Sequence, residues 1–176
     1  DDTQIDLKIT AFIPSEWITD NDNKIQAYKT ISECSNKQEL VELAACWNDQ
    51  YGALPKAVIS LFDLMELKLI TKSLGISRVK ISQQNIHLES TMEEKTFLSM
   101  RKLLPSHIQS RFLFNKSDLV NIIVIRGLGS LEASRQIEQL TDWLEIIFMN
   151  VIQEDGFSRK QKQDKMKEAN QKVMAP

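Results

Sequence analysis

Residues 5–14 read Ile-Asp-Leu-Lys-Ile-Thr-Ala-Phe-Ile-Pro, and apolar side chains recur at every second position up to residue 11. This period of two is typical of a half-buried β-strand, so we expect a strand over residues 5–13. Pro14 ends it, because proline has no backbone N–H to donate to a neighbouring strand. Residues 15–18 then predict a single turn in which Trp17 serves as an anchor.

Three helices are expected to follow. The first covers about 22–34. The second is capped by Ser35 and ended by Gly52, which suits the left-handed position at a helix C-terminus. Pro55 suits the first turn of the third, over about 55–74, which is apolar on several sides and therefore predicted to be the central helix. The faces expected to be buried are Ile25, Tyr28 and Ile31; Leu40, Leu43, Ala44, Trp47 and Tyr51; and Val58, Leu61, Phe62, Met65 and Leu69.

After Gly75 the apolar period changes from that of a helix to that of a strand. Residues 79–88 predict a hairpin that turns at 83–85, and a short helix over 91–104 follows, closed by Pro105. Two more strands are expected around 112–114 and 120–124, and a last helix over about 130–154. Because the elements do not alternate as βαβ units, the sequence predicts an α+β fold. It has a helical N-terminal half with one strand, then a small antiparallel sheet backed by a long C-terminal helix.

The 176 residues predict a single domain over residues 1–157, with a helical part over about 1–75 and a sheet part over about 76–157. Residues 158–176 differ in composition. They contain six Lys or Arg and two acidic residues, so they carry +4 and the remainder carries −6. They contain few large apolar residues, and we expect them to form a basic, flexible tail.

Composition excludes several classes of protein. The net charge of −2 gives no overall field that would attract nucleic acid or phospholipid. The longest apolar runs are far shorter than the roughly 20 residues that a membrane span needs, and no signal peptide is evident. Cys34 and Cys46 are expected to be free, mostly buried thiols in a cytoplasmic protein. The chain begins with Asp1 rather than Met, so we expect a piece of a larger protein.

No stretch carries the signature of an active site. The segment Gly127–Ser130 lacks the third glycine of a dinucleotide fingerprint and the Gly-Lys of a phosphate-binding loop, so it predicts a turn. His87 and His107 have no partner at ligand spacing. Residues 20–23 lack the glycine and glutamate of a calcium loop and predict a helix cap. We therefore expect no catalytic, cofactor-binding or metal-binding residues.

Three segments match the sequence motifs of one known family in their order and spacing. They are Ile5–Pro14; Ile18-x-Asp20 before Lys24-Ile25-x-x-Tyr28-Lys29; and Asp49-x-Tyr51-Gly52-x-Leu54-Pro55. Together they resemble the C-terminal (TRCF) domain of the bacterial transcription-repair coupling factor (Mfd). The resemblance covers roughly residues 5–79, and the rest of the chain less specifically.

The resemblance implies a non-catalytic regulatory domain in transcription-coupled nucleotide-excision repair. The family proteins are ATP-driven DNA translocases that displace stalled RNA polymerase and recruit UvrA; their motor motifs are absent here. In the family this domain packs on the UvrB-like N-terminal module of the same chain and masks the surface that UvrA needs. The implied fragment is monomeric, has no cofactor and does not bind membranes. The interface candidates carried over are Cys46, Asp49, Gln50 and Tyr51.

The chain departs from the family at this candidate interface. Family members commonly have Arg at the position of Gln50, and Arg forms a charge-assisted fork with a carboxylate that Gln cannot form. Cys46 stands one turn earlier, where a charged residue would add to the surface. These differences predict that the domain binds the masked module less tightly, or binds it through other residues.

Other interpretations remain open at this point. Asp49 and Tyr51 could simply close their helix and pack on Trp47, with Gly52 making the turn. The chain could instead be an accessory nucleic-acid-binding module that uses the basic tail, through Lys160, Lys162, Lys165 and Lys167. A third interpretation is a small enzyme whose site forms only at an interface.

Overall fold

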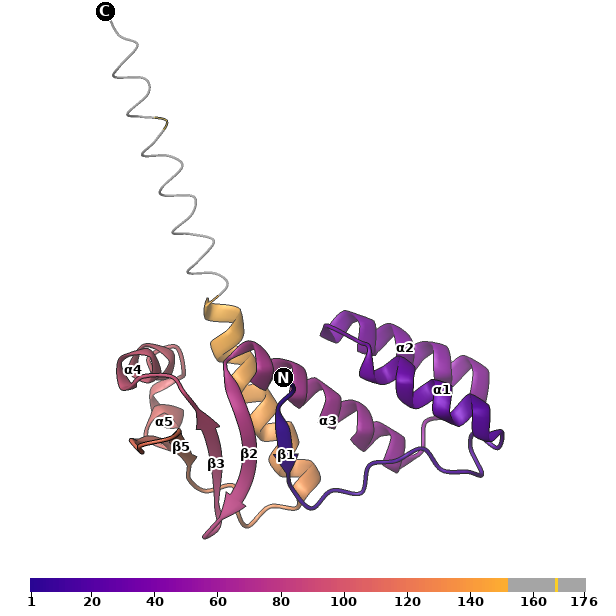
Figure 1. Cartoon of the computed structure of the whole chain (residues 1–176), viewed down its shortest axis with the longest axis horizontal. Coiled ribbons are helices and arrows are strands. Elements are labelled where there is room, and N and C mark those ends of the chain that lie inside the picture. The colour runs from indigo at the N-terminus through magenta and orange to yellow at the C-terminus, as the bar shows by residue number, and fades with distance from the viewer. Residues whose placement is uncertain (152–166, 168–176) are drawn as a thin grey trace, which may run out of the picture.

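The computed structural model describes residues 1–151 and Lys167. A short strand and three helices come first, then strands and short helices, then a long last helix over residues 133–151, called the C-terminal helix below (Figure 1). The order confirms the α+β class. The elements are β1 (Gln4–Asp6), α1 (Asn21–Ser32), α2 (Lys37–Tyr51), α3 (Lys56–Ser73), β2 (Ile76–Ser82), β3 (Asn85–Ser90), α4 (Glu94–Arg101), α5 (Ser106–Gln109), β4 (Phe112–Asn115) and β5 (Asn121–Ile125).

The five strands form one mixed sheet in the order β1-β2-β3-β5-β4. β1 runs parallel to β2, with Ile5 opposite Val79, and the other neighbours are antiparallel. The small antiparallel sheet predicted for the second half of the domain is confirmed by β2, β3, β5 and β4. β1 joins the same sheet as an edge strand, and α1–α3 provide the long crossover that a parallel pair requires.

The predicted strand over residues 5–13 is also too long, since β1 covers only Gln4–Asp6. The burial of the following residues still alternates, for a different reason. Leu7 and Ile9 pack against one hydrophobic core, and Ala11 and Ile13 belong to another. The period of two therefore reflects an extended segment that contacts two cores in succession, without the hydrogen bonds of a sheet.

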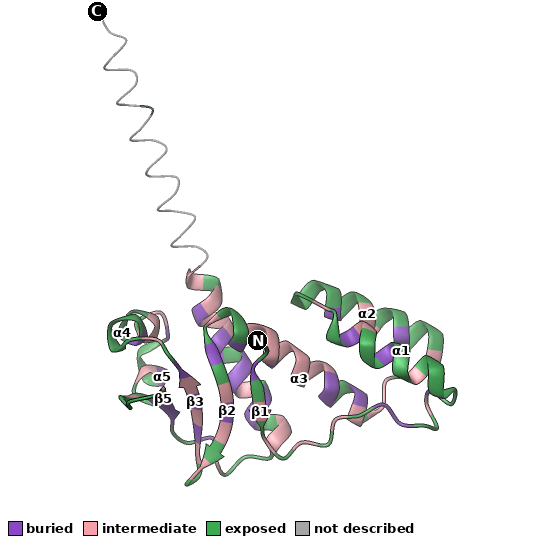
Figure 2. Ribbon diagram, in the orientation of Figure 1, coloured by how far each residue is buried: buried purple, intermediate pink, exposed green. Residues whose placement is uncertain are grey.

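The main core lies between one face of the sheet and the C-terminal helix. β2 and β3 place Val79 and Leu88 opposite each other on this face, and both are fully buried. Along β3, buried residues alternate with residues of intermediate burial (Figure 2), as expected for a strand with one covered face. The buried members from the C-terminal helix are Ile137, Leu140, Trp143, Leu144 and Ile147.

A second core fills the space between α1, α2, α3 and the turn at residues 15–18. α3 contributes to both cores, with Leu67 in the main core and Val58 in the second. Figure 1 shows α3 running from the side of the sheet to the α1–α2 pair. The prediction of α3 as the central helix is therefore confirmed. The buried members of the second core are Ile13, Ile18, Ala27, Ile31, Leu40, Trp47, Val58 and Leu61.

The capping residue of α2 and the buried face of α1 differ from the sequence prediction. Asn36, not Ser35, is the N-cap of α2: its Oδ1 accepts the Glu39 N–H at 2.9 Å, while the Ser35 N–H donates to the Glu39 carboxylate at 2.7 Å. Both side chains can accept hydrogen bonds, so sequence alone does not choose between them. Ile25 was expected on a buried stripe but is 66% exposed, because α1 contacts the core along Ala27 and Ile31 instead.

The end of the chain is described only in part. The C-terminal helix begins three residues later than predicted, and its predicted end at residue 154 lies outside the described residues. The predicted basic tail lies outside them as well, apart from Lys167. Among the residues that the structure describes, no helix is both long enough and apolar enough to cross a membrane.

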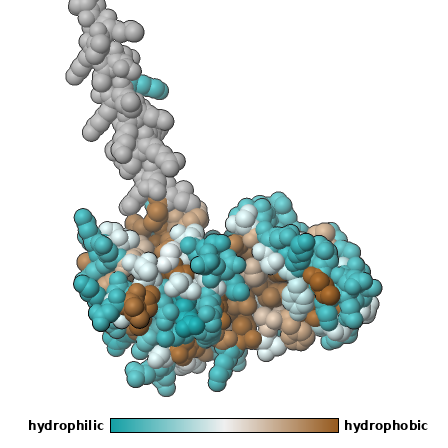
Figure 3. Space-filling view, viewed as in Figure 1, coloured by the Kyte–Doolittle hydropathy of each residue, from teal (hydrophilic) through white to brown (hydrophobic). Residues whose placement is uncertain are grey.

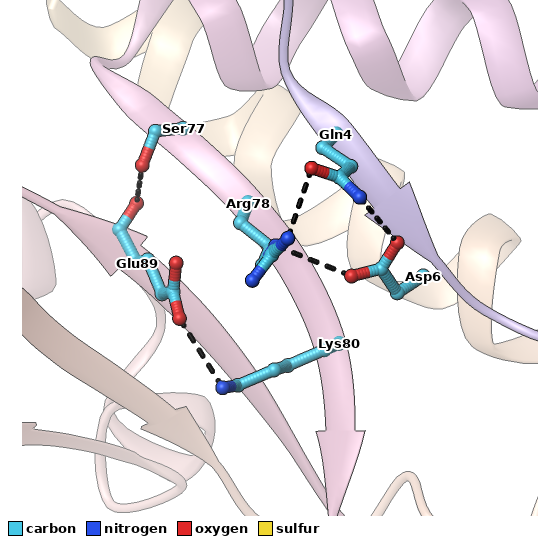
Figure 4. A network of polar contacts seen from close by, with 6 residues as sticks. All are labelled: Gln4, Asp6, Ser77, Arg78, Lys80 and Glu89. Atoms are coloured by element: carbon cyan, nitrogen blue, oxygen red, sulfur yellow. Dashed lines mark hydrogen bonds and ion pairs between the residues drawn. The ribbon is translucent and has the colours of Figure 1, made fainter.

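Polar contacts on the uncovered face of the sheet hold β1 against β2 (Figure 4). The Arg78 guanidinium donates to Gln4 Oε1 at 3.0 Å and pairs with the Asp6 carboxylate at 3.2 Å. On the next strand pair, Lys80 pairs with Glu89 at 3.2 Å. Because β1 has only three residues, these side-chain contacts add to the few backbone hydrogen bonds that join it to β2.

Replacing Arg78 with Ala is expected to lower the free energy of unfolding by about 0.5–1 kcal/mol, because the pair is partly exposed and screened by water. Urea denaturation followed by circular dichroism measures the change. Lys95→Ala is the control, because Lys95 is exposed and takes part in none of the ion pairs among the described residues. Equal effects of the two substitutions would contradict this role of Arg78.

Candidate functional site

The residues suggested by the resemblance lie together at the C-terminal end of α2. Cys46, Asp49 and Gln50 are exposed, and Tyr51 is half-buried. Positions i, i+3 and i+4 share one side of a helix, so the first three form a single solvent-facing ridge. We call this set of four residues the α2 ridge. Figure 3 shows hydrophilic side chains over most of the surface of the α1–α2 pair.

Tyr51 joins the ridge to the second core through a series of aromatic contacts. Its ring lies 5.4 Å from that of Trp17, and Trp17 lies 6.1 Å from Trp47. Trp47 in turn makes an edge contact with Phe62 of α3 at 5.2 Å. The interpretation that Tyr51 packs on a tryptophan of the domain is therefore supported, but that tryptophan is Trp17 rather than Trp47. These contacts fix the position of the ridge relative to α3.

The ridge is electrostatically negative. The carbonyl groups at the C-terminus of a helix carry a partial negative charge, and the Asp49 carboxylate adds a full one. The last turn of α2 contains no basic residue. Within residues 1–151, none of the ion pairs involves Asp49. The ridge thus presents negative potential that the described part of the domain leaves uncompensated.

The two cysteines are free, as predicted, but only one is shielded from solvent. Cys34 is half-buried at the end of α1, where burial and then the nearby Glu39 carboxylate raise the pKa of its thiol. Cys46 is exposed, so the expectation of two mostly buried thiols is wrong for this residue.

The other candidate residues of the sequence analysis lie in separate parts of the domain. Asp20 caps α1 by accepting the Asn23 N–H at 2.9 Å, as expected. His87 lies on the uncovered face of the sheet, where partial burial and then Lys80 lower its pKa. Gly127 makes a turn with φ of +88°. Among the described residues, no three His, Cys, Asp or Glu side chains stand close enough together to bind a metal ion.

One polar feature had no signal in the sequence. Lys37 of α2 pairs with Glu66 of α3 at 3.2 Å and with Glu145 of the C-terminal helix at 3.1 Å. The three residues are far apart along the chain, and each alone looks like an ordinary solvated charge. Only the packing of three helices brings them together.

Comparisons with known proteins place the chain in a family. The family described as "TRCF domain" matches residues 7–103, more than half of the chain. The transcription-repair-coupling factor of Borreliella burgdorferi is 29% identical over 140 residues, which are 70% of this chain and 12% of that protein. Those of Haemophilus influenzae and Bacillus subtilis are 31% identical over 85 residues and 28% over 102. The chain thus spans about a tenth of the length of these relatives, 12%, 7% and 9% respectively.

A solved structure agrees with this placement. The crystal structure of the C-terminal domain of a transcription-repair coupling factor superposes with a TM-score of 0.63, covering 84% of this chain and 94% of that one. The two are 19% identical, so this likeness shows the fold. Together with the family match, it leads to one conclusion: the chain belongs to the TRCF family and has the fold of the C-terminal domain of transcription-repair coupling factors.

Proposed function

We propose that this domain is a non-catalytic regulatory element of a longer transcription-repair coupling factor. It acts by covering the UvrB-like module of its own chain and so limits recruitment of UvrA during transcription-coupled repair. DNA translocation and the action on RNA polymerase belong to the rest of that chain in this proposal. Support comes from family membership and from the small share of the relatives' length that this domain represents.

The observation that carries the proposal is the α2 ridge. It is exposed and negatively charged, and the Trp17–Trp47–Phe62 contacts behind it hold its backbone in place. A rigid polar ridge suits a surface that must bind and release, because interfaces between domains of one chain are modest in area and rather polar. A masking contact needs a coupling free energy of only about 1–3 kcal/mol to change the exposure of the masked surface.

Gln50 sets the strength of this contact in the proposal. Its amide forms ordinary hydrogen bonds, whereas an Arg at this position adds a charge-assisted pair. An Arg side chain at position 50 pairs with a carboxylate of the partner, while Asp49 pairs with a basic group of the partner. With Gln50, the present domain holds its partner less tightly and releases it more readily.

The direct test is a titration of this domain against the isolated UvrB-like module of the same coupling factor, by calorimetry at physiological salt. Asp49→Ala is expected to weaken binding by about ten- to a hundredfold, since a hydrogen bond to a charged group contributes roughly 1.5–3 kcal/mol. Gln50→Arg is expected to strengthen binding about three- to tenfold. Asp118→Ala, an exposed carboxylate in the loop between β4 and β5, is the matched control and should change nothing.

Two results would count against the proposal. One is saturable binding that neither Asp49→Ala nor Gln50→Arg alters. The other is the absence of contact even when both modules are joined in one chain, where the effective concentration reaches the millimolar range. The nucleic-acid alternative depends on residues 158–176, almost all of which lie outside the described part of the chain, and it stays a prediction.

A further inference from the structure

Three helices enclose a small acidic hollow on another side of the domain. Its volume is about 150 Å³, and α2, α3 and the C-terminal helix contribute its walls. We call it the acidic trough. Its charged and polar residues are Lys37, Asp63, Glu66, Glu138, Thr141, Asp142 and Glu145.

The trough holds five carboxylates and one lysine. Lys37 is already engaged, with its Nζ between Glu66 and Glu145. Burial, and then the charges of Glu66 and Glu138, raise the pKa of the Asp63 carboxyl. Burial and the neighbouring glutamates also raise the pKa of Asp142. The carboxylates therefore repel one another, and a second cationic group would relieve the repulsion.

A buried hydroxyl points to the same conclusion independently. Thr141 lines the trough and is only 7% exposed, and its Oγ1 has no hydrogen-bond partner among the described residues. Leaving such a group unpaired away from water costs about 1–3 kcal/mol. An ammonium or guanidinium N–H that enters the trough can donate to this oxygen and to the carboxylates around it.

The trough continues into a second, more apolar hollow of about 460 Å³ along the same helix. Asp142 and Glu145 line both hollows, and Met149, which is 52% exposed, lies at the far end beside Asn150. This end is one residue from Val151, where the continuously described chain stops. The two hollows together thus begin next to Val151, the residue to which the chain over 152–176 is joined.

We infer that the acidic trough is the docking site for the chain's own basic end, residues 158–176. These residues carry +4 and the rest of the chain −6, so the two are complementary in charge. They offer several basic side chains, one of which can supply the cationic group that the trough lacks, and the apolar side chains Met166, Val173 and Met174 suit the apolar hollow. The inference does not depend on the masking function.

The length of chain is sufficient. The C-terminal helix covers about 18 Å from Asn150 back to Glu138, at 1.5 Å per residue. The segment from Val151 to Ser158 reaches about 23 Å when extended. Asp155 and Gly156 lie within it, and this dipeptide is a strong turn signal where a chain must reverse. The tether also gives the basic end a high effective concentration at the trough.

The trough and the α2 ridge are separate surfaces. Lys37 and Cys46 are nine residues apart on α2, which places them on opposite sides of the helix at 3.6 residues per turn. Occupation of the trough therefore leaves the ridge free. It also withholds the basic end from phosphate groups, which is the chemistry of the nucleic-acid alternative.

The test is zero-length carbodiimide cross-linking of the full chain, read out by mass spectrometry. A mixture of ¹⁴N- and ¹⁵N-labelled chains distinguishes links within a chain from links between chains. The pairs Lys37–Glu66 and Lys37–Glu145 provide a built-in positive control.

We expect links from lysines of residues 158–176 to Asp63, Glu138 and Glu145 within one chain, at least fivefold above links to Glu93 and Asp118. Links spread evenly over all carboxylates would overturn the inference, and so would links only between light and heavy chains, which indicate docking on a second copy.

A second measurement uses a variant and a different readout. Asp63→Asn, Glu138→Gln and Asp142→Asn together remove three of the five carboxylates of the trough and keep both Lys37 pairs. Tryptic cleavage within residues 158–176 is expected to become at least threefold faster in this variant, because the docked lysines are released. The control combines Glu93→Gln with Asp118→Asn and should cleave like the parent chain. Circular dichroism verifies that each variant is folded, and an unchanged cleavage rate in the triple variant would overturn the inference.

Discussion

Replacing Trp47 with Ala is expected to lower the free energy of unfolding by about 3–5 kcal/mol, the usual cost of truncating a buried aromatic residue. Trp47 is 4% exposed and contacts Trp17 on one side and Phe62 on the other. The substitution removes apolar burial and opens a cavity between α2 and α3. A loss of this size is a large part of the total stability of a domain, which is about 5–15 kcal/mol.

The measurement is urea denaturation followed by far-ultraviolet circular dichroism, since fluorescence would be confounded by the loss of a tryptophan. Val41→Ala is the control on the same helix. Val41 is 53% exposed, so its truncation should change stability by less than about 0.5 kcal/mol. A loss below 1 kcal/mol would mean that the second core can repack around the missing ring.

Replacing Gly129 with Ala should cost about 2–3 kcal/mol through steric overlap alone. A Cβ at this position would overlap the backbone carbonyl of Gln84. Gln83 and Gln84 form the two-residue turn between β2 and β3 and have φ of +50° and +65°, so this turn is already in a region that side chains rarely adopt. The turn at Gln83 and Gln84 is held by β2 and β3, and the turn at Gly129 is held between β5 and the C-terminal helix, so neither backbone moves away freely.

Two controls separate this overlap from backbone strain. Gly75 has φ of +74° but open space around its Cβ position, so Gly75→Ala measures the strain of a left-handed residue, about 1–2 kcal/mol. Ser130→Ala changes the next residue, which is exposed, and should have little effect. Thermal unfolding ranks the three variants. A Gly129→Ala chain as stable as the Ser130→Ala chain would disprove the close approach of the turn and this loop.

Local patterns were sufficient to predict most elements. Helical periodicity predicted α1, α2 and α3, and Gly52 ends α2 with φ of +90°, as expected from its freedom at positive φ. Alternation predicted the β2–β3 hairpin and placed its turn within one residue, although β2 begins three residues earlier than the predicted hairpin. These features depend on side chains close in sequence, so the sequence contains the information directly. The α2 ridge was assigned by resemblance, and its position as a set of adjacent helical residues follows from the spacing.

Long-range packing decided the rest. The alternation of residues 5–13 predicted a long strand, but the choice of partner and the end of pairing at Asp6 depend on β2, about 70 residues away. The segment Gly127–Ser130 reads as a turn from sequence, and only the contact with Gln84 shows that Gly129 is needed for close approach.

By itself the sequence determined the α+β class, the helices and the candidate ridge, because periodicity, caps and turns are local. The tertiary structure decided that β1 completes a mixed sheet and that Tyr51 packs on Trp17. It also brought five carboxylates from α3 and the C-terminal helix around one lysine of α2. No local pattern encodes such a cluster, because its energy arises from charges that become neighbours only when the helices pack.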